Sequence, residues 1–435
     1  MKDLRNAVGA MCAVPMPGVT ALHALAGELR AAGRSVRSLA FEIPRFEPPA
    51  GLLDSCIEWL RQGEPGGAPA AGLPELRRAL AEKLSRDCKV PCTALNLVVT
   101  PGERFARFAA IAALCGPGDE VILPVPCRME YRALVHAAGA TCVELRTRTQ
   151  EGFELEPGLL EAAVTGRTRL LILNTPSWPA GTVYRRETLE ALAAIAVRHN
   201  FMVLSDECLV SFVGEPDRAH VSFASLSDEA ANRCITLGGF SAGCFMENHP
   251  VGFVAAPEWL SGRIIALQQL VSGGASALDQ HCALAALTAP VQQEMAELRR
   301  AIVENREWFC RSLETVSGLE LFRPAGGLSL LCGIAGFGMD SDLFCERLLR
   351  EELLEAVPGR EFGAEGYIGL SFACPASWLK DAAGSLAAFC GKIFRSGLNK
   401  EGSSFPVFLN CSRESREVPE FIVPTLIEKN TNFFG

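Results

Sequence analysis

The segment from Phe201 to Ala256 constrains the fold of this chain more than any other. It contains two short, continuous apolar runs, at 201–204 and 234–237, each bounded by polar or glycine-rich residues. Such runs predict buried strands of a parallel sheet. The loops after them open at the carboxyl edge of the sheet, where α/β proteins bind their ligands. We therefore expect the chemistry of the protein at this edge.

The region before these strands predicts the rest of the sheet. Residues 96–145 read as strand, glycine turn, helix, strand, helix and strand. This alternation is typical of a parallel sheet built through right-handed crossovers. The turn at its start leads into Gly102, Glu103 and Arg104, where the free amides of a helix N-terminus form a candidate phosphate loop. A well-capped helix with Glu103 in its first turn explains the same residues, because the helix dipole favours an acid there.

The order of these motifs resembles that of the class I/II aminotransferases, the fold type I enzymes that use pyridoxal phosphate (PLP). Asp206 ends the first strand, as does the family Asp that pairs with the pyridinium nitrogen. Twenty-eight residues separate Trp178 from Asp206 and 36 separate Asp206 from Ala242, the spacings of the family's Asn, Asp and Lys. The resemblance covers about residues 15–395. It implies an α/β fold with a three-layer, mostly parallel large domain and a smaller α+β domain made from both chain ends.

The resemblance also implies domain boundaries. Residues 1–48 form an N-terminal arm and part of the small domain, 49–285 the large domain, and 286–395 the rest of the small domain. Residues 396–435 are rich in Ser, Asn, Pro and charge, and we expect a mobile tail there. The family works as a dimer, so we expect a homodimer or a heterodimer with an active paralogue.

Most of the family's functional residues are replaced in this chain, and of its PLP contacts Asp206 is retained. The replaced positions are Ala242 (Schiff-base lysine), Trp178 (Asn on the ring oxygen), Leu209 (Tyr), Pro250 (phosphate Arg), Gly67 (Tyr reaching the partner's phosphate), Arg128 (stacking aromatic) and Gly369 (Arg on the substrate carboxylate). The indole of Trp178 is larger than an amide, so we expect it to fill space that the cofactor ring occupies in the family. Without its partners, Asp206 is also explained by hydrogen bonds to loop amides.

The lysines decide the functional prediction. The chain has none between Val90 and Leu379; its lysines are Lys2, Lys83, Lys89, Lys380, Lys392, Lys400 and Lys429. Because PLP transamination needs an amine that forms an imine, we predict a pseudoenzyme that holds no cofactor and has a binding or partner-stabilising role.

Two alternatives remain open. One is a working PLP-dependent aminotransferase that acts on an amino acid. The other is a PLP-independent enzyme that reuses the cleft for a small-molecule ligand, and it predicts an open pocket lined by Trp178, Asp206, Arg128 and His249. A scaffold without a ligand predicts a cleft filled by side chains. Four arginines, Arg104, Arg107, Arg128 and Arg132, are together candidates for an anion site, although we expect Arg107 and Arg132 on solvated helix faces.

Composition excludes other classes of function. The formal net charge is −9 with no offsetting basic stripe, which argues against nucleic acid or an anionic membrane as a partner. No apolar run reaches membrane-spanning length, so we expect a cytoplasmic protein. Seventeen cysteines and six histidines are scattered without ligand spacing, so we expect no metal and interpret the cysteines as small buried hydrophobes.

Overall fold

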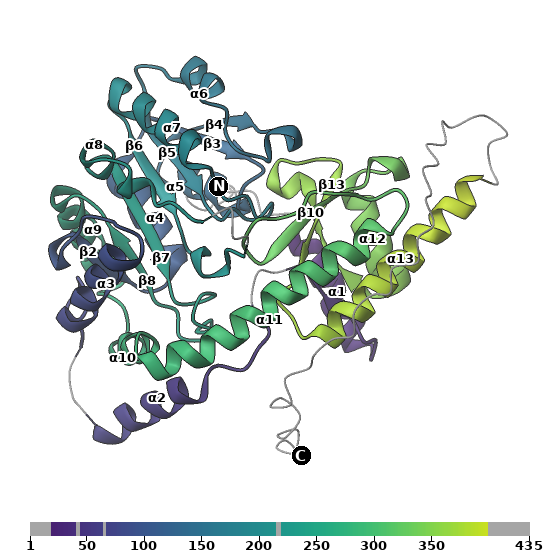
Figure 1. Ribbon diagram of the computed structural model, residues 1–435, viewed down its shortest axis with the longest axis horizontal. Helices are drawn as coiled ribbons and strands as arrows, with labels where there is room; N and C mark the ends of the chain where they lie inside the picture. Colours follow the sequence, from purple (N-terminus) through teal and green to yellow (C-terminus); the bar gives the residue numbers. More distant parts are fainter. Residues whose placement is uncertain (1–18, 41–43, 64–66, 215–218, 399–435) are drawn as a thin grey trace, which may run out of the picture. The chain divides into compact units, whose positions relative to one another are not determined.

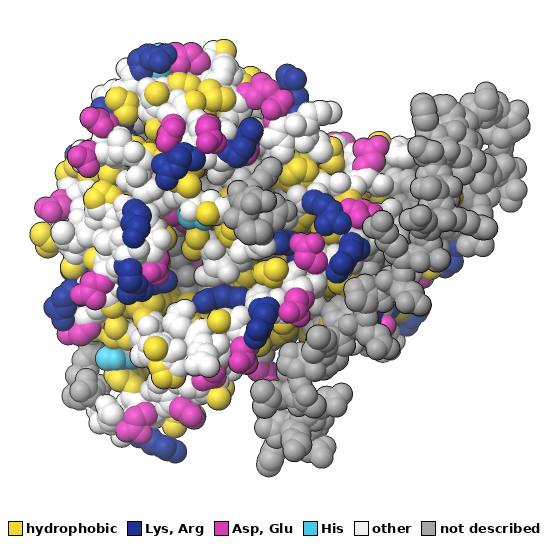
Figure 2. Space-filling model, in the orientation of Figure 1, with side chains coloured by type: hydrophobic (Ala, Val, Ile, Leu, Met, Phe, Trp, Pro, Cys, Tyr) yellow, Lys and Arg dark blue, Asp and Glu magenta, His cyan; other side chains and the backbone are white. Residues whose placement is uncertain are grey.

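A computed structural model describes residues 19–40, 44–63, 67–214 and 219–398 (Figure 1). The predicted tail lies outside these residues from 399 onward. No helix among the described residues is long and apolar enough to cross a membrane. Likewise, these ranges contain no cluster of three or more His, Cys, Asp or Glu side chains able to hold a metal ion. On the face shown in Figure 2, basic and acidic side chains interleave.

The main element is a seven-stranded sheet with strand order β2-β8-β7-β6-β5-β3-β4. Only β8 runs antiparallel to its neighbours, so the predicted mostly parallel sheet is confirmed. The strands are β2 (Leu97–Thr100), β3 (Glu120–Val125), β4 (Thr141–Arg146), β5 (Thr168–Asn174), β6 (Met202–Asp206), β7 (Cys234–Gly239) and β8 (Gly252–Ala255).

Helices cover both faces of this sheet, which explains why its strands are apolar on both sides (Figure 1). Neighbouring residues of β6 show this, since Val203 belongs to one buried cluster and Leu204 to the other. The helices of this region are α3 (Pro74–Asp87), α4 (Glu103–Leu114), α5 (Met129–Ala137), α6 (Pro157–Ala163), α7 (Arg186–His199), α8 (Asp228–Ala231), α9 (Glu258–Val271) and α10 (Ala277–Ala286).

Both chain ends contribute to a second region. Its four-stranded antiparallel sheet has the order β12-β13-β10-β9, and the two-residue β1 pairs parallel with β11. The strands are β1 (Arg37–Ser38), β9 (Glu320–Leu321), β10 (Ser329–Gly333), β11 (Leu354–Glu355), β12 (Val357–Pro358) and β13 (Tyr367–Ser371). The remaining helices are α1 (Val19–Ala31), α2 (Ala50–Gln62), α11 (Ala289–Glu314), α12 (Ser341–Glu352) and α13 (Ala376–Leu398). The predicted α+β region from both ends is therefore present, while its exact boundaries stay predictions.

One pair of cysteines differs from the sequence interpretation. Cys56 on α2 and Cys282 on α10 form a disulfide across a sequence separation of 226 residues. Two cysteines so far apart in the sequence carry no local signal that they meet, which is why they were interpreted as hydrophobes. The other described cysteines are free, and most of them are buried.

Candidate functional site

A cavity of about 370 Å³ lies at the carboxyl edge of the seven-stranded sheet. The first turn of α4, the start of α5 and the loops after β5, β6 and β7 surround it. Its lining comprises Pro101, Gly102, Glu103, Arg104, Arg107, Arg128, Met129, Glu130, Trp178, Leu209, Ser241, Ala242, Glu247 and Pro250. The structure thus brings together most of the positions singled out in the sequence, and the cleft is open.

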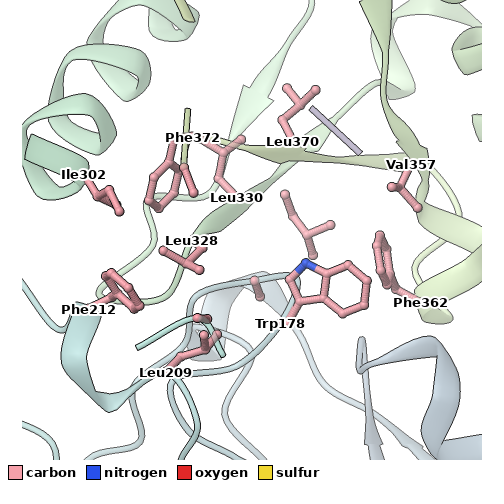
Figure 3. Packing of buried hydrophobic residues seen from close by; sticks show 14 of the residues in the cluster. Trp178, Leu209, Phe212, Ile302, Leu328, Leu330, Val357, Phe362, Leu370 and Phe372 are labelled. Carbon is pink, nitrogen blue, oxygen red and sulfur yellow. The ribbon is translucent and has the colours of Figure 1, made fainter. Parts of the chain in front are cut away.

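Trp178 forms one wall of this cleft. Its ring meets the ring of Phe362 edge to face, with 4.9 Å between centroids, and Figure 3 shows it among Leu330, Val357 and Leu370 of the second sheet. The guanidinium carbon of Arg128 lies 5.4 Å from the centroid of the indole, within cation–π range. Although Trp178 is larger than an amide, it directs its bulk into this apolar cluster and leaves the cavity beside it.

Gly369 lies on β13 next to the same cluster. A Cβ at this position would come within 2.8 Å of the Phe362 ring. At the position where the family carries its carboxylate-binding Arg, a side chain would therefore require the Phe362 ring to move.

Asp206 is fully buried at the end of β6 and is held by residues of this chain. Its Oδ2 accepts hydrogen bonds from Arg107 Nε at 2.6 Å and from the Tyr131 hydroxyl at 2.5 Å, and its Oδ1 accepts one from the Cys208 amide at 3.2 Å. Burial by itself raises the pKa of Asp206, but the charges of Arg107 and Arg128 outweigh burial and hold this pKa well below its usual range.

The prediction that Arg107 lies on a solvated helix face is wrong. Its side chain is 2 % exposed, because α4 packs against the sheet and Asp206 supplies the counter-charge. Asp206 is 99 residues away in the sequence, so no local sequence pattern predicts that the two residues pair. Arg132 is partly exposed and pairs with Glu144, in better agreement with expectation.

The candidate phosphate loop carries acids at its mouth. Burial raises the pKa of Glu103, although Arg107 and Arg128 oppose it, and partial burial raises the pKa of Glu247. Within the part of the chain that the structure describes, Glu103 Oε1 and Arg107 Nη2 are buried and make no hydrogen bond, although Arg107 Nη2 lies 3.8 Å from Glu103 Oε2. A dianionic phosphate placed here would meet both carboxylates, and Pro250 offers no charge to offset them.

Two other candidates lie outside the cleft. His249 is 40 % exposed and its Nδ1 lies 3.0 Å from Asp279 Oδ1, so it is paired away from the cavity. No neighbouring atom lies within 4 Å of the position of a Cβ on Gly67.

The residues of this cleft do not fit PLP in the way the resemblance implies. Asp206 Oδ2 already accepts hydrogen bonds from Arg107 and Tyr131, and Asp206 is not among the residues that line the cavity. Ala242 carries no amine. Of the lysines that the structure describes, which are Lys83, Lys89, Lys380 and Lys392, none lines the cavity.

The chain has a seven-stranded sheet with a cleft at its carboxyl edge, and a second, smaller region to which both chain ends contribute. These features define an α/β protein of the aminotransferase architecture. The family model described as "Aminotransferase class I and II" matches residues 62–386. The chain belongs to this family.

Named relatives extend the likeness over most of the chain. The probable aspartate/prephenate aminotransferase of Aquifex aeolicus is 34% identical over 364 residues, which are 82% of this chain and 92% of that protein. The aspartate/prephenate aminotransferase of Thermus thermophilus is 32% identical over 90% of this chain and its own full length. Among solved structures, the T. thermophilus aspartate aminotransferase with maleate has a TM-score of 0.82 at 31% identity, covering 87% of this chain and 97% of that one. The aspartate aminotransferase of Rhizobium meliloti has a TM-score of 0.84 at 27% identity, covering 88% and 98%.

These relatives contradict the prediction of a pseudoenzyme unable to carry out transamination. That prediction rested on a few replaced positions, whereas the identity to proteins named as aminotransferases extends over most of the chain. A replaced side chain removes one contact, and it leaves the fold and the open cleft in place. The relatives favour an aminotransferase acting on an amino acid.

Proposed function

We propose that this protein transfers amino groups between an acidic amino acid and a 2-oxo acid, as a class I/II aminotransferase. The observation that carries the proposal is the identity of 32–34% to proteins named as aspartate/prephenate aminotransferases, over 82–90% of the chain. Aspartate is the amino acid named in both relatives.

The open cleft supports the binding of a small molecule. Its volume of about 370 Å³ lies within the range of small-molecule sites. Its lining carries both signs of charge, with Arg104, Arg107 and Arg128 set against Glu103, Glu130 and Glu247. An acidic amino acid has carboxylates for the guanidiniums and an ammonium group for an acid, so its charges complement this lining.

In this proposal, some residues of the cleft bind the ligand and others accept or release protons. Asp206 stays ionised and orients Arg107 through the hydrogen bond between them. Burial raises the pKa values of Glu103 and Glu247, and these two side chains are the candidates for accepting or releasing a proton in the cleft. Since no described lysine lines the cleft, the proposal assigns no covalent step to a lysine of this chain.

Glutamate formation from aspartate and 2-oxoglutarate tests the proposal. One arm contains added PLP and one does not, and each is compared with heat-denatured protein at the same concentration. We expect glutamate to form in proportion to the folded protein and to saturate with aspartate. A rate no higher than that of the denatured control in both arms would refute the proposal.

A second candidate is a PLP-independent reaction in the same cleft. The internal pairing of Asp206 with Arg107 favours it, because Arg107 already neutralises the carboxylate that the family pairs with the cofactor ring. The two arms separate the candidates: turnover that needs added PLP supports the first, and turnover that is unaffected by PLP supports the second.

We further propose a homodimer located in the cytoplasm. The solution mass measured by light scattering tests the assembly, with a mass of two chains expected. A monomer, or a different chain that co-purifies in equal amount, would contradict it.

A further inference from the structure

We infer that Arg104 and Arg107, three residues apart on α4, anchor the carboxylates of the ligand in the cleft. This inference rests on the proposed function, because it assumes that the ligand is an acidic amino acid or the corresponding oxo acid. The inference places the side chains that bind the ligand carboxylates on the side of the cleft formed by the large sheet, and not on the side of the second sheet.

Among the described residues, no cation from the second sheet lines the cavity. Gly369 carries no side chain, and the Phe362 ring occupies the space beside it. Phe362 in turn packs on Trp178, which closes this wall with apolar atoms (Figure 3). The guanidiniums that line the cavity therefore come from the opposite side, where α4 and the start of α5 lie.

Arg107 is the buried anchor. Its Nε donates to Asp206 at 2.6 Å and its Nη1 to Glu130 at 3.4 Å, while its Nη2 makes no hydrogen bond within the described residues and has Glu103 Oε2 as an ion-pair partner at 3.8 Å. A buried donor without an acceptor is costly, and a guanidinium fixed by a second carboxylate is preorganised for one more. A ligand carboxylate in the adjacent cavity supplies the missing acceptor.

Arg104 is the anchor at the mouth. It is exposed and lines the cavity, and its charge lowers the pKa of Glu247 against the effect of burial. Residues three apart on a helix share a face, so Arg104 and Arg107 point to the same side of α4. The positive end of the α4 dipole lies beside them and adds to the attraction for an anion. Two guanidiniums on one face suit a ligand with two carboxylates.

The acids of the cleft weaken this attraction only in part. Glu130 is compensated, since its Oε1 lies 3.4 Å from Arg107 Nη1 and 3.7 Å from Arg128 Nη1. Glu103 is paired as well, since its Oε2 lies 3.8 Å from Arg107 Nη2, whereas Glu247 remains a charge that a ligand carboxylate meets.

Calorimetric titration with succinate and with acetate, in the absence of any turnover, tests the two anchors separately. Arg104→Gln removes the outer anchor, and Arg78→Gln on the exposed face of α3 is the matched control. Arg107→Lys keeps the positive charge that pairs with Asp206 but loses the planar guanidinium with its several donors. The thermal unfolding of this variant shows whether it is folded.

We expect Arg104→Gln to weaken succinate binding by about tenfold and to leave acetate within about threefold of wild type, as befits the loss of one charge-assisted contact. Arg107→Lys should weaken both ligands, and Arg78→Gln neither. Succinate affinity that is the same in Arg104→Gln as in Arg78→Gln would overturn the inference, as would a wild-type protein that does not bind succinate. Unchanged binding in folded Arg107→Lys would show that only a water satisfies Nη2 and would overturn the role of Arg107.

The result is distinguishable from the test of function. Arginine-dependent succinate binding without glutamate formation would refute the proposed aminotransferase and leave the anchors standing. Glutamate formation with arginine-independent binding would do the reverse.

Discussion

Replacement of Arg107 by Leu should destabilise the protein because it leaves a buried carboxylate without its cation. Asp206 is fully buried, and its hydrogen bond from Arg107 is 2.6 Å long. Removing one partner of a buried ion pair costs about 3–5 kcal/mol, since the other charge stays desolvated. Tyr131 still donates to Asp206 in the variant, so we expect the lower half of this range. Denaturant unfolding at pH 7.5 measures the loss.

The pH dependence identifies the cause. The pKa of Asp206 is depressed in the folded protein, so its contribution to stability is present above the unfolded pKa and is lost as the pH falls through the folded pKa. In Arg107→Leu the depression disappears and burial raises this pKa instead. The free-energy gap between wild type and Arg107→Leu should therefore be largest near neutral pH and shrink toward pH 4.

A double variant provides the control. Arg107→Leu combined with Asp206→Asn removes both charges and retains the shape of the carboxylate side chain, so it should be more stable at neutral pH than Arg107→Leu alone, with a gap that varies little with pH. The reasoning is refuted if Arg107→Leu unfolds within about 1 kcal/mol of wild type, the scale of an exposed ion pair. A loss that is the same at pH 7.5 and pH 4.5 would also refute it.

Three further perturbations follow from the packing. Trp178→Ala should lower the free energy of unfolding by about 3–5 kcal/mol, because it leaves a cavity against Phe362; a loss below 1 kcal/mol would show that the ring is not part of the core. Gly369→Ala should also destabilise, since its Cβ would meet Phe362 at 2.8 Å, and a thermal midpoint at or above that of wild type would contradict this. A thiol reductant should lower the thermal midpoint of wild type but not of Cys56→Ser, because the disulfide constrains a long loop and is worth about 2–5 kcal/mol; equal shifts in both proteins would argue against the bond.

The sequence alone determined the sheet and the place of the cleft. Strands β6 and β7 lie where their short apolar runs predicted them, and the loops after them line the cavity at the carboxyl edge. Such features depend on residues close together in the chain, and patterns of burial repeat within a single element. The spacing of Trp178, Asp206 and Ala242 likewise identified the family.

The tertiary structure decided how the residues of the cleft are paired. Arg107 was expected in solvent and instead holds Asp206, which lies 99 residues away, and Trp178 was expected to fill the cleft and instead forms its wall against Phe362. Each outcome depends on which side chains from distant segments share one space, and on charges that stabilise each other only once they are buried together. A motif position shows which chemical group has been replaced, but the room and the charges left around it are set by packing across the whole fold.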